Sequence, residues 1–453
     1  EVVMKYSFLV ILLFSITILY SDQLCWSQYG ADSRHTSNID VNGILKIPSL
    51  EWKYSVYDSN GNWIVQGLIN DGEGNIYFAA VDDGNAEAHF QSIDRDGKLR
   101  WEKALSVGYK IYPVLDDYRK QVYIDADGLT AYTINGDIIW TRDDLRRMNN
   151  ILISESGNLY FIRGRITKLT PDGTTIWQKD YKIHYEKCPA VDSDETCYAI
   201  DENNILNCID SLGELKWTFN LGTLTGTKSV SIGDSTIFYA CDKNLLCIRK
   251  DGTEKWRYGF ERTEYDGQGT PSITSEGNVV FRNNNYIYCF KPDGSIKFQW
   301  DSVERYYNAY PIIIDKENRI YEMDVCLDKD GNPLWENNTS TADRNLIMDK
   351  DGRLLRANYQ LNVYSVECFT SSNSFSRTVF TSSLPTPSLS ISPNPFSTHL
   401  SVSLPSSGAI YYLTGQLIMN MSKGKHSIDT SKWREGVYIV KSGKETKRLV
   451  KFN

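Results

Sequence analysis

Short runs in which apolar and polar residues alternate, bounded by Asn, Asp or Gly, recur along most of the chain. Other short runs between such turn residues are rich in aromatic and apolar residues, as in Asn158–Ile162, Thr236–Ala240 and Leu246–Arg249. A period of two with turn residues at both ends is typical of β-strands. Helical periodicity is missing from the sequence after residue 24. The pattern therefore predicts an all-β protein.

The strands belong to a repeating unit of roughly forty residues. Each unit ends in a turn glycine followed four residues later by an aromatic residue, and successive aromatics stand 37 to 42 residues apart. The glycine–aromatic pairs are Gly97/Trp101, Gly136/Trp140, Gly173/Trp177, Gly213/Trp217, Gly252/Trp256, Gly294/Phe298 and Gly331/Trp335. Such a repeat, filled with short strands, indicates stacked units that bury their faces only against one another.

The sequence of each unit predicts four strands, and the first of them is expected to be the innermost strand of its blade. This strand often has proline near its start, as in Tyr112–Asp116 and Tyr310–Ile314, in keeping with the exclusion of proline from central strands. Seven units are complete, whereas Leu346–Glu367 supplies only three strands. The missing strand is Leu50–Tyr54, and sharing one blade between both ends of the chain removes free edges. We predict an eight-bladed β-propeller in which Trp52 pairs near Leu361–Glu367.

The aromatic residues of the repeat are predicted to dock neighbouring blades from equivalent buried positions. They are Trp52, Trp101, Trp140, Trp177, Trp217, Trp256, Phe298 and Trp335. The slot five residues before the turn glycine holds Cys208, Cys247, Cys289 and Cys326 in the later units. Equivalent slots in neighbouring blades lie too far apart for disulfides, so these cysteines are predicted to be small buried residues. A disulfide between Cys188 and Cys197 stays open.

The repeat resembles that of the pyrroloquinoline-quinone-like β-propeller superfamily, which has eight blades and a tryptophan-docking motif on the outer strand. The family pattern is similar to Ala-x-Asp-x-x-x-Gly-x-x-x-Trp, and the cysteine slot corresponds to its Ala. The opening run Trp26–Thr36 also resembles the first segment of many secreted propellers. The resemblance covers about residues 26–368, and it implies a fold more specifically than an activity.

Beyond the repeats, residues 369–388 are rich in Ser and Thr and are predicted to be an extended linker. Residues 389–453 predict a small antiparallel β-sandwich that begins near Ser392-Pro393-Asn394-Pro395-Phe396 and ends on a basic strand. The ordered motifs resemble the type-A C-terminal sorting domain of the type IX secretion system. The resemblance implies the secretion machinery as a partner and a secreted or outer-surface location.

At the other end, Lys5 and the apolar run Phe8–Leu19 predict a secretory signal within residues 1–24, starting at Met4 and cleaved between Tyr20 and Cys25. The run is too short to span a bilayer, so no membrane span is expected after its removal. The remaining residues 25–368 are assigned to the propeller. A net charge of −8 and a pI near 5.4 argue against a nucleic-acid partner.

The sequence contains no metal-ligand spacing, nucleophile elbow or phosphate loop. Asp94–Gly97 and Asp328–Gly331 would suggest calcium loops, but they lead straight into strands and therefore predict hairpin turns. The adjacent cysteines found in quinone dehydrogenases of the resembling family are missing. We predict no catalytic, cofactor-binding or metal-binding residue. A quinone-dependent oxidoreductase or a hydrolase with a dispersed acidic site remains the alternative.

Aromatic residues collect near the crossovers that lead from the last strand of one unit to the first strand of the next. The candidate ligand face comprises Trp63, Tyr109, Tyr181, Tyr185, Tyr258, Tyr265, Trp300, Tyr306 and Tyr307. Tyr and Trp combine an apolar face with a hydrogen-bonding group, which suits stacking on sugars or anchoring peptides. With 29 tyrosines in the chain, a purely structural role in strands is the competing interpretation. We predict a non-catalytic surface module that binds a glycan or a protein, or that serves as a scaffold.

Overall fold

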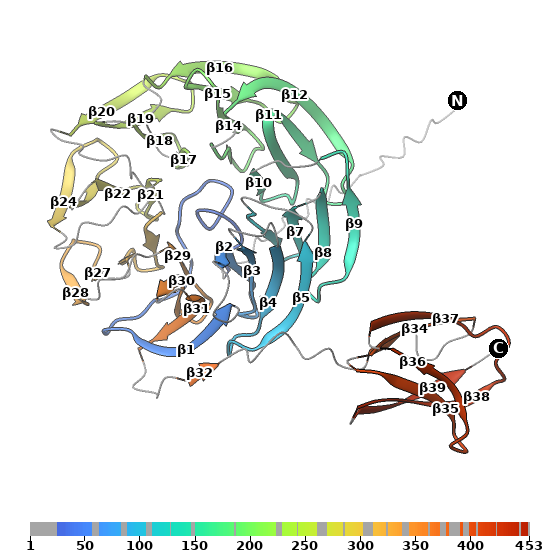
Figure 1. Cartoon of the computed structure of the whole chain (residues 1–453). Coiled ribbons are helices and arrows are strands. Elements are labelled where there is room, and N and C mark those ends of the chain that lie inside the picture. The colour runs from blue at the N-terminus through green and yellow to red at the C-terminus, as the bar shows by residue number, and fades with distance from the viewer. Residues whose placement is uncertain are drawn as a thin grey trace, which may run out of the picture. The chain divides into compact units, whose positions relative to one another are not determined.

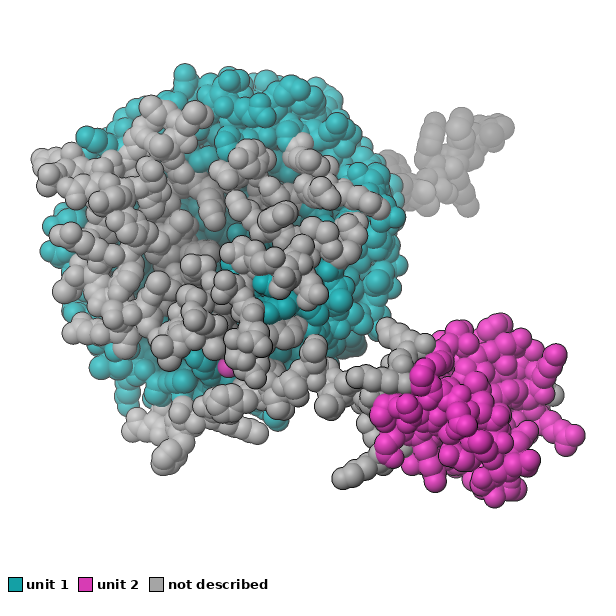
Figure 2. Space-filling model, in the orientation of Figure 1, with its two compact units in different colours: residues 1–54, 62–379 teal, residues 55–61, 380–453 magenta. Residues whose placement is uncertain are grey.

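The computed structural model describes residues 25–56, 63–82, 88–105, 111–126, 128–145, 150–184, 187–222, 229–241, 243–260, 270–283, 286–301, 311–322, 325–337, 344–360, 363–371, 377–379, 390–392, 398–404, 406–422, 424–443 and 445–451. Every regular element within these ranges is a β-strand. The chain divides into two compact units, residues 1–54 with 62–379 and residues 55–61 with 380–453, coloured teal and magenta in Figure 2.

Eight sheets of the first unit are arranged in a ring and form the predicted propeller (Figure 1). Blades 1 to 4 are β2 (Trp63–Asn70), β3 (Ile76–Asp82), β4 (Ala88–Ile93), β5 (Leu99–Leu105); β6 (Val114–Asp116), β7 (Gln121–Asp125), β8 (Leu129–Thr133), β9 (Ile138–Arg142); β10 (Asn150–Ile153), β11 (Leu159–Leu169), β12 (Thr175–Ile183); and β13 (Ala190–Val191), β14 (Cys197–Ile200), β15 (Ile205–Ile209), β16 (Leu215–Asn220). Within each blade the first strand is innermost and the order follows the chain.

Blades 5 to 7 repeat the four-stranded plan, and blade 8 closes the ring. They are β17 (Ser231–Ile232), β18 (Thr236–Cys241), β19 (Asn244–Arg249), β20 (Glu254–Gly259); β21 (Ser272–Ile273), β22 (Val279–Asn283), β23 (Tyr286–Phe290), β24 (Ile296–Asp301); β25 (Ile313–Ile314), β26 (Ile320–Glu322), β27 (Val325–Leu327), β28 (Pro333–Glu336); and β29 (Arg344–Met348), β30 (Leu354–Gln360), β31 (Val363–Thr370), β1 (Ser49–Val56), β32 (Arg377–Val379).

Blade 3 differs in that its second and third strands form one element, β11. The part before Gly164 pairs with β10, and the part from Gly164 onward pairs with β12. Gly164 has a φ of +69°, a left-handed conformation that glycine adopts without steric cost. The glycine therefore lets one continuous element serve two partners.

Both ends of the propeller meet in blade 8, as the incomplete eighth repeat predicts. β1 lies between β31 and β32, and Lys53 Nζ is 3.2 Å from Glu367 Oε1 across the junction with β31. Burial raises the pKa of Glu367, but Arg356 and its other partners outweigh burial and hold this pKa below its usual range. β32 lies inside the segment predicted as a linker and pairs with β1 in parallel. This pairing is possible because the outermost of the four strands of a blade leaves backbone groups on its outer edge available for a further strand.

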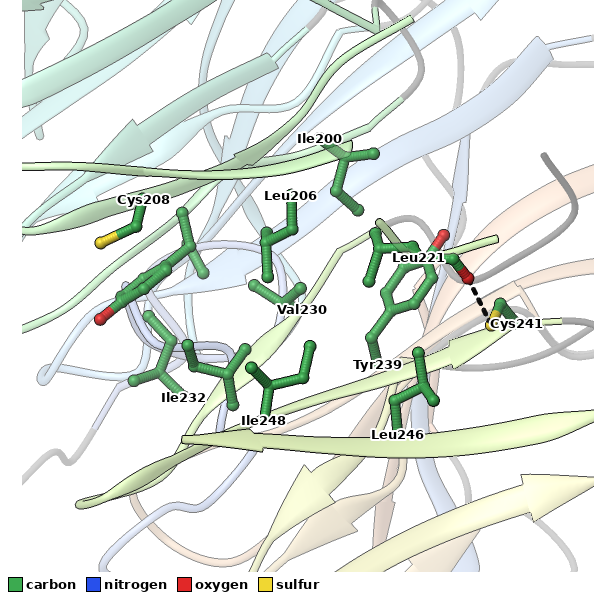
Figure 3. Packing of buried hydrophobic residues seen from close by; sticks show 13 residues of the cluster. Ile200, Leu206, Cys208, Leu221, Val230, Ile232, Tyr239, Cys241, Leu246 and Ile248 are labelled. Carbon is green, nitrogen blue, oxygen red and sulfur yellow. Dashed lines mark hydrogen bonds between the residues drawn. The ribbon is translucent and has the colours of Figure 1, made fainter. Parts of the chain in front are cut away.

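The core consists of apolar clusters between neighbouring blades. The cluster in Figure 3 joins Ile200 and Leu206 of blade 4 to Ile232, Tyr239 and Ile248 of blade 5, and each of these side chains is almost fully buried. Alternate residues of a strand point to opposite faces of its sheet. One strand can therefore contribute to the clusters on both sides, which is why the middle strands are apolar at nearly every position.

Each docking aromatic of blades 8 and 1 to 6 lies on the turn glycine of the next blade. A Cβ on Gly97 would be 2.7 Å from the Trp52 ring, and the same relation joins Gly136 to Trp101 and Gly331 to Phe298. The indole N–H of each of the seven tryptophans donates to a carbonyl at 2.9 to 3.2 Å. Only Trp52 and Trp335 are fully buried. The others are half-buried because the outer strand leaves one side of the ring toward solvent.

The second unit contains two small sheets. One is β33 (Ser390–Ser392), β34 (His399–Leu404) and β37 (Gly424–Asp429); the other is β36 (Leu417–Met421), β35 (Gly408–Tyr412), β38 (Gly436–Ser442) and β39 (Glu445–Lys451). Leu400, Val402, Ile410, Val440 and Leu449 form their shared core. The predicted β-sandwich is thereby confirmed, with its own core.

Candidate functional site

The two sides of the propeller ring are defined by the direction of the inner strands. Each inner strand runs from a crossover to the first turn of its blade, so all crossovers lie on one side and all first turns on the other. The third turns, which carry the repeated glycines, share the side of the first turns. We call these the crossover side and the turn side.

Four residues of the candidate ligand face are described, and all four lie in strands rather than in the crossovers. Trp63 opens β2, Tyr181 is in β12, Tyr258 is in β20 and Trp300 is in β24. Tyr109, Tyr185, Tyr265, Tyr306 and Tyr307 lie outside the described residues.

The four described aromatics do not form one platform. Trp63 stacks edge-on against His89, with ring centroids 5.3 Å apart. Tyr181 donates its hydroxyl to Gly213 O at 2.7 Å, in the third turn of the next blade. Tyr258 and Trp300 pack, half-buried, against two different interblade clusters. For these four the structural role in strands accounts for the observed contacts.

The turn side holds a feature that the repeat pattern did not predict. Residues 26–39, which we call the inner segment, run inside the ring of innermost strands (Figure 1). One inner-strand amide from each of blades 1 to 7 donates to this segment at 2.8 to 3.0 Å: Asn70 to Trp26 O, Leu115 to Ser27 O, Ile153 to Gln28 Oε1, Val191 to Ser33 O, Ile232 to Arg34 O, Ile273 to Thr36 O and Ile314 to Ser37 O. Six of the seven donors end their strand, which places the segment at the turn side.

Side chains of the inner segment add polar contacts to distant blades. Gln28 Nε2 donates to Ile153 O at 2.8 Å, and Tyr29 Oη lies 2.7 Å from Thr270 Oγ1. Within the segment, Asp32 Oδ1 accepts the amides of Arg34 and Thr36 at 2.9 and 3.0 Å. The sequence signal for this arrangement was only the resemblance of Trp26–Thr36 to the first segment of other propellers.

His35 is the most deeply buried titratable side chain of the inner segment, with 1% of its surface exposed. Its Nδ1 lies 2.7 Å from Ser229 Oγ and 3.2 Å from Val230 O, and its ring meets Tyr29 edge-on. Burial lowers the pKa of His35 to about 4. The imidazole is therefore neutral in the folded protein over most of the acidic range.

We expect this burial to make the fold acid-sensitive. Between the ordinary pKa near 6.5 and the folded value near 4, the unfolded chain binds a proton that the folded chain does not, so stability falls as pH falls. The full loss for this group is about 3 kcal/mol. The check is the free energy of unfolding from pH 7 to 4 for the native chain and for His35→Asn, since Asn tolerates the φ of +56° at this position. Equal pH slopes in the two proteins would contradict the assignment.

The aspartate side chains of the Asp-Gly turns accept hydrogen bonds from backbone amides within the same turn. Asp94 Oδ1 accepts the amides of Asp96 and Lys98, both at 2.9 Å, and Asp328 Oδ1 accepts those of Asp330 and Asn332 at 2.9 and 2.8 Å. Both segments are hairpin turns, as predicted. Within the described ranges, no group of three or more His, Cys, Asp or Glu side chains is placed to hold a metal ion.

The cysteine slot lies opposite the docking aromatic in the next strand. Cys208 pairs with Trp217, Cys247 with Trp256, Cys289 with Phe298 and Cys326 with Trp335. Burial raises the pKa of Cys247 to about 11 and that of Cys289 to about 12, so these thiols stay protonated and unreactive. Cys188 and Cys197 are not joined to each other in this structure, so the disulfide left open by the sequence is not formed.

The geometry defines an eight-bladed β-propeller followed by a β-sandwich tail, and comparisons with known proteins place both parts. Residues 162–391 match the family described as "Outer membrane protein assembly factor BamB", and residues 390–452 match the "Secretion system C-terminal sorting domain". Because the first match spans half of the chain, the protein belongs to this family of PQQ-like repeat propellers. The tail shows that it is exported to the outer cell surface or secreted.

One solved structure supports the fold. The C-terminal WD40 domain of Sif2 is 10% identical, covers 72% of this chain and 99% of its own, and has a TM-score of 0.52. BamB from Moraxella catarrhalis is 13% identical, with 73% and 99% covered and a TM-score of 0.41. A search of curated proteins finds no match. In the described part of the chain, no helix has the length and apolar character needed to cross a membrane.

Proposed function

We propose that this protein is a non-catalytic binding module of the outer cell surface or the surrounding medium, and that it recognises a glycan or a protein through the crossover side of its propeller. The observation that carries the proposal is the position of the inner segment. It takes one hydrogen bond from each of seven blades at the turn side. The crossover side is the opposite side of the ring.

The composition of the longest crossovers supports this choice. The connection between β20 and β21 runs from Gly259 to Ser272, and that between β24 and β25 runs from Asp301 to Ile313. They carry Tyr265, Tyr306 and Tyr307 among charged residues. Loops on a rigid scaffold are where binding residues concentrate, and tyrosine provides both stacking area and a hydroxyl.

The test compares two tyrosine variants of the mature protein on a glycan array and in a pull-down of cell-surface proteins. Tyr265→Ala/Tyr306→Ala/Tyr307→Ala should weaken binding about tenfold or more, because aromatic anchors dominate such interfaces. Tyr118→Ala is the matched control, since Tyr118 is 87% exposed in a first turn on the opposite side. Binding that survives the triple substitution excludes these crossovers. Quinone-dependent dye reduction or glycan hydrolysis by the purified protein would favour the enzyme alternative.

A further inference from the structure

The inner segment contacts the propeller as a bound peptide would. Its carbonyl groups and the Gln28 side chain accept amides from seven different blades. Main-chain hydrogen bonds to unpaired strand backbones are the usual way in which a sheet protein binds an extended peptide. In the usual arrangement the peptide pairs with the edge of one sheet. Here the segment instead accepts hydrogen bonds from the inner strands of seven separate sheets.

The inner segment would not keep its backbone conformation if it were detached from the propeller. Ala31, His35 and Ser37 have φ values of +71°, +56° and +56°. Residues other than glycine rarely adopt this left-handed conformation, and it persists only where surrounding contacts impose it. The surrounding contacts here are the inner strands, together with Ser229 and Thr270 of blades 5 and 6.

We propose that the turn-side mouth of the propeller is a peptide-binding site, and that its occupant is residues 26–39 of the same chain. The binding groups belong to seven blades, so the complete site exists only after those blades have assembled. The segment is therefore the last part of the propeller to dock. It acts as a non-covalent latch that ties the inner strands of blades 1 to 7 together.

The connection to β1 allows the latch to be tested in the whole protein. Ile44 is buried, and its carbonyl accepts the Trp335 indole N–H at 2.9 Å. Leu45 and Ile47 are 52% and 58% exposed, and β1 begins at Ser49. A protease recognition sequence inserted between Leu45 and Ile47 can be cut after folding without removing any contact of the inner segment.

The first experiment cuts this site in the full-length protein and follows the fragment by size-exclusion chromatography. We expect the N-terminal fragment to co-elute with the propeller at neutral pH and to separate only in denaturant. Immediate separation under native conditions would overturn the proposal.

The second experiment measures binding of a synthetic peptide of residues 25–41 to a chain that begins at residue 42, or to the cut protein after exchange if that chain does not fold. Gly30→Val in the peptide should weaken binding about tenfold or more, because Gly30 has a φ of +70° and a Cβ there would lie 2.8 Å from His35. Asp40→Asn is the control, since Asp40 forms a partly exposed ion pair with Lys316, and such a pair contributes little to stability or binding. Equal affinity of the Gly30→Val and native peptides would overturn the proposal.

Discussion

Deleting residues 389–453 should leave a folded propeller that no longer reaches the cell surface. The tail has its own core, built from residues such as Val402 and Val440, and the interblade clusters are built from propeller residues. The region that matches the sorting domain, residues 390–452, lies within the deletion. In a host with type IX secretion, we expect the truncated protein in the periplasm and the full chain at the surface or in the medium, as measured by fractionation and immunoblotting.

A pair of substitutions in β34 separates loss of the tail from loss of its fold. Val402 is 1% exposed in the tail core, whereas the neighbouring Ser401 is exposed. A charge at position 402 would be buried in the apolar core of the tail, so Val402→Asp should unfold the tail and reproduce the deletion. Ser401→Asp should be exported normally. Surface delivery of the truncated chain would refute the sorting role of the tail.

Trp52→Ala should destabilise the propeller by about 3–5 kcal/mol. Trp52 is 2% exposed, its indole N–H donates to Arg95 O at 3.0 Å, and its ring lies on Gly97 of blade 1. It also belongs to β1, the strand that joins the two ends of the ring. The measurement is the free energy of unfolding of the full chain in denaturant, followed by circular dichroism.

Trp256→Ala is the matched comparison, because Trp256 docks in the same way but is only half-buried. Its cost should be clearly smaller. A second control is Gly97→Ala, where the added Cβ would lie 2.7 Å from the Trp52 ring and the φ of +78° would be strained. In a double-mutant cycle, removing the Trp52 ring should relieve the steric part of this cost and leave the backbone part. Equal losses for Trp52→Ala and Trp256→Ala would contradict a special role for the closing blade.

The candidate ligand face was only partly accessible to sequence reasoning. The predicted strand order placed four aromatic residues near crossovers but did not predict their contacts. These residues are Trp63, Tyr181, Tyr258 and Trp300. Tyr181 binds a turn of the next blade, and Tyr258 enters a cluster with Phe260 and Phe290. A tyrosine at a strand end has the same local sequence signal whether it packs between blades or faces a ligand. Only the neighbouring blade distinguishes the two roles.

The sequence by itself determined the number of blades, the closure of the ring and the export of the protein. The number of blades follows from features that recur in each unit, namely a turn glycine at positive φ, an aromatic residue four positions later and a strand of period two. The closure of the ring and the export follow from the incomplete eighth unit and from the motifs of the tail. The tertiary structure alone decided the place of the inner segment and of β32. Both are held largely through backbone groups of distant strands, and backbone hydrogen bonds place little demand on side-chain identity, so such contacts leave almost no pattern in the sequence.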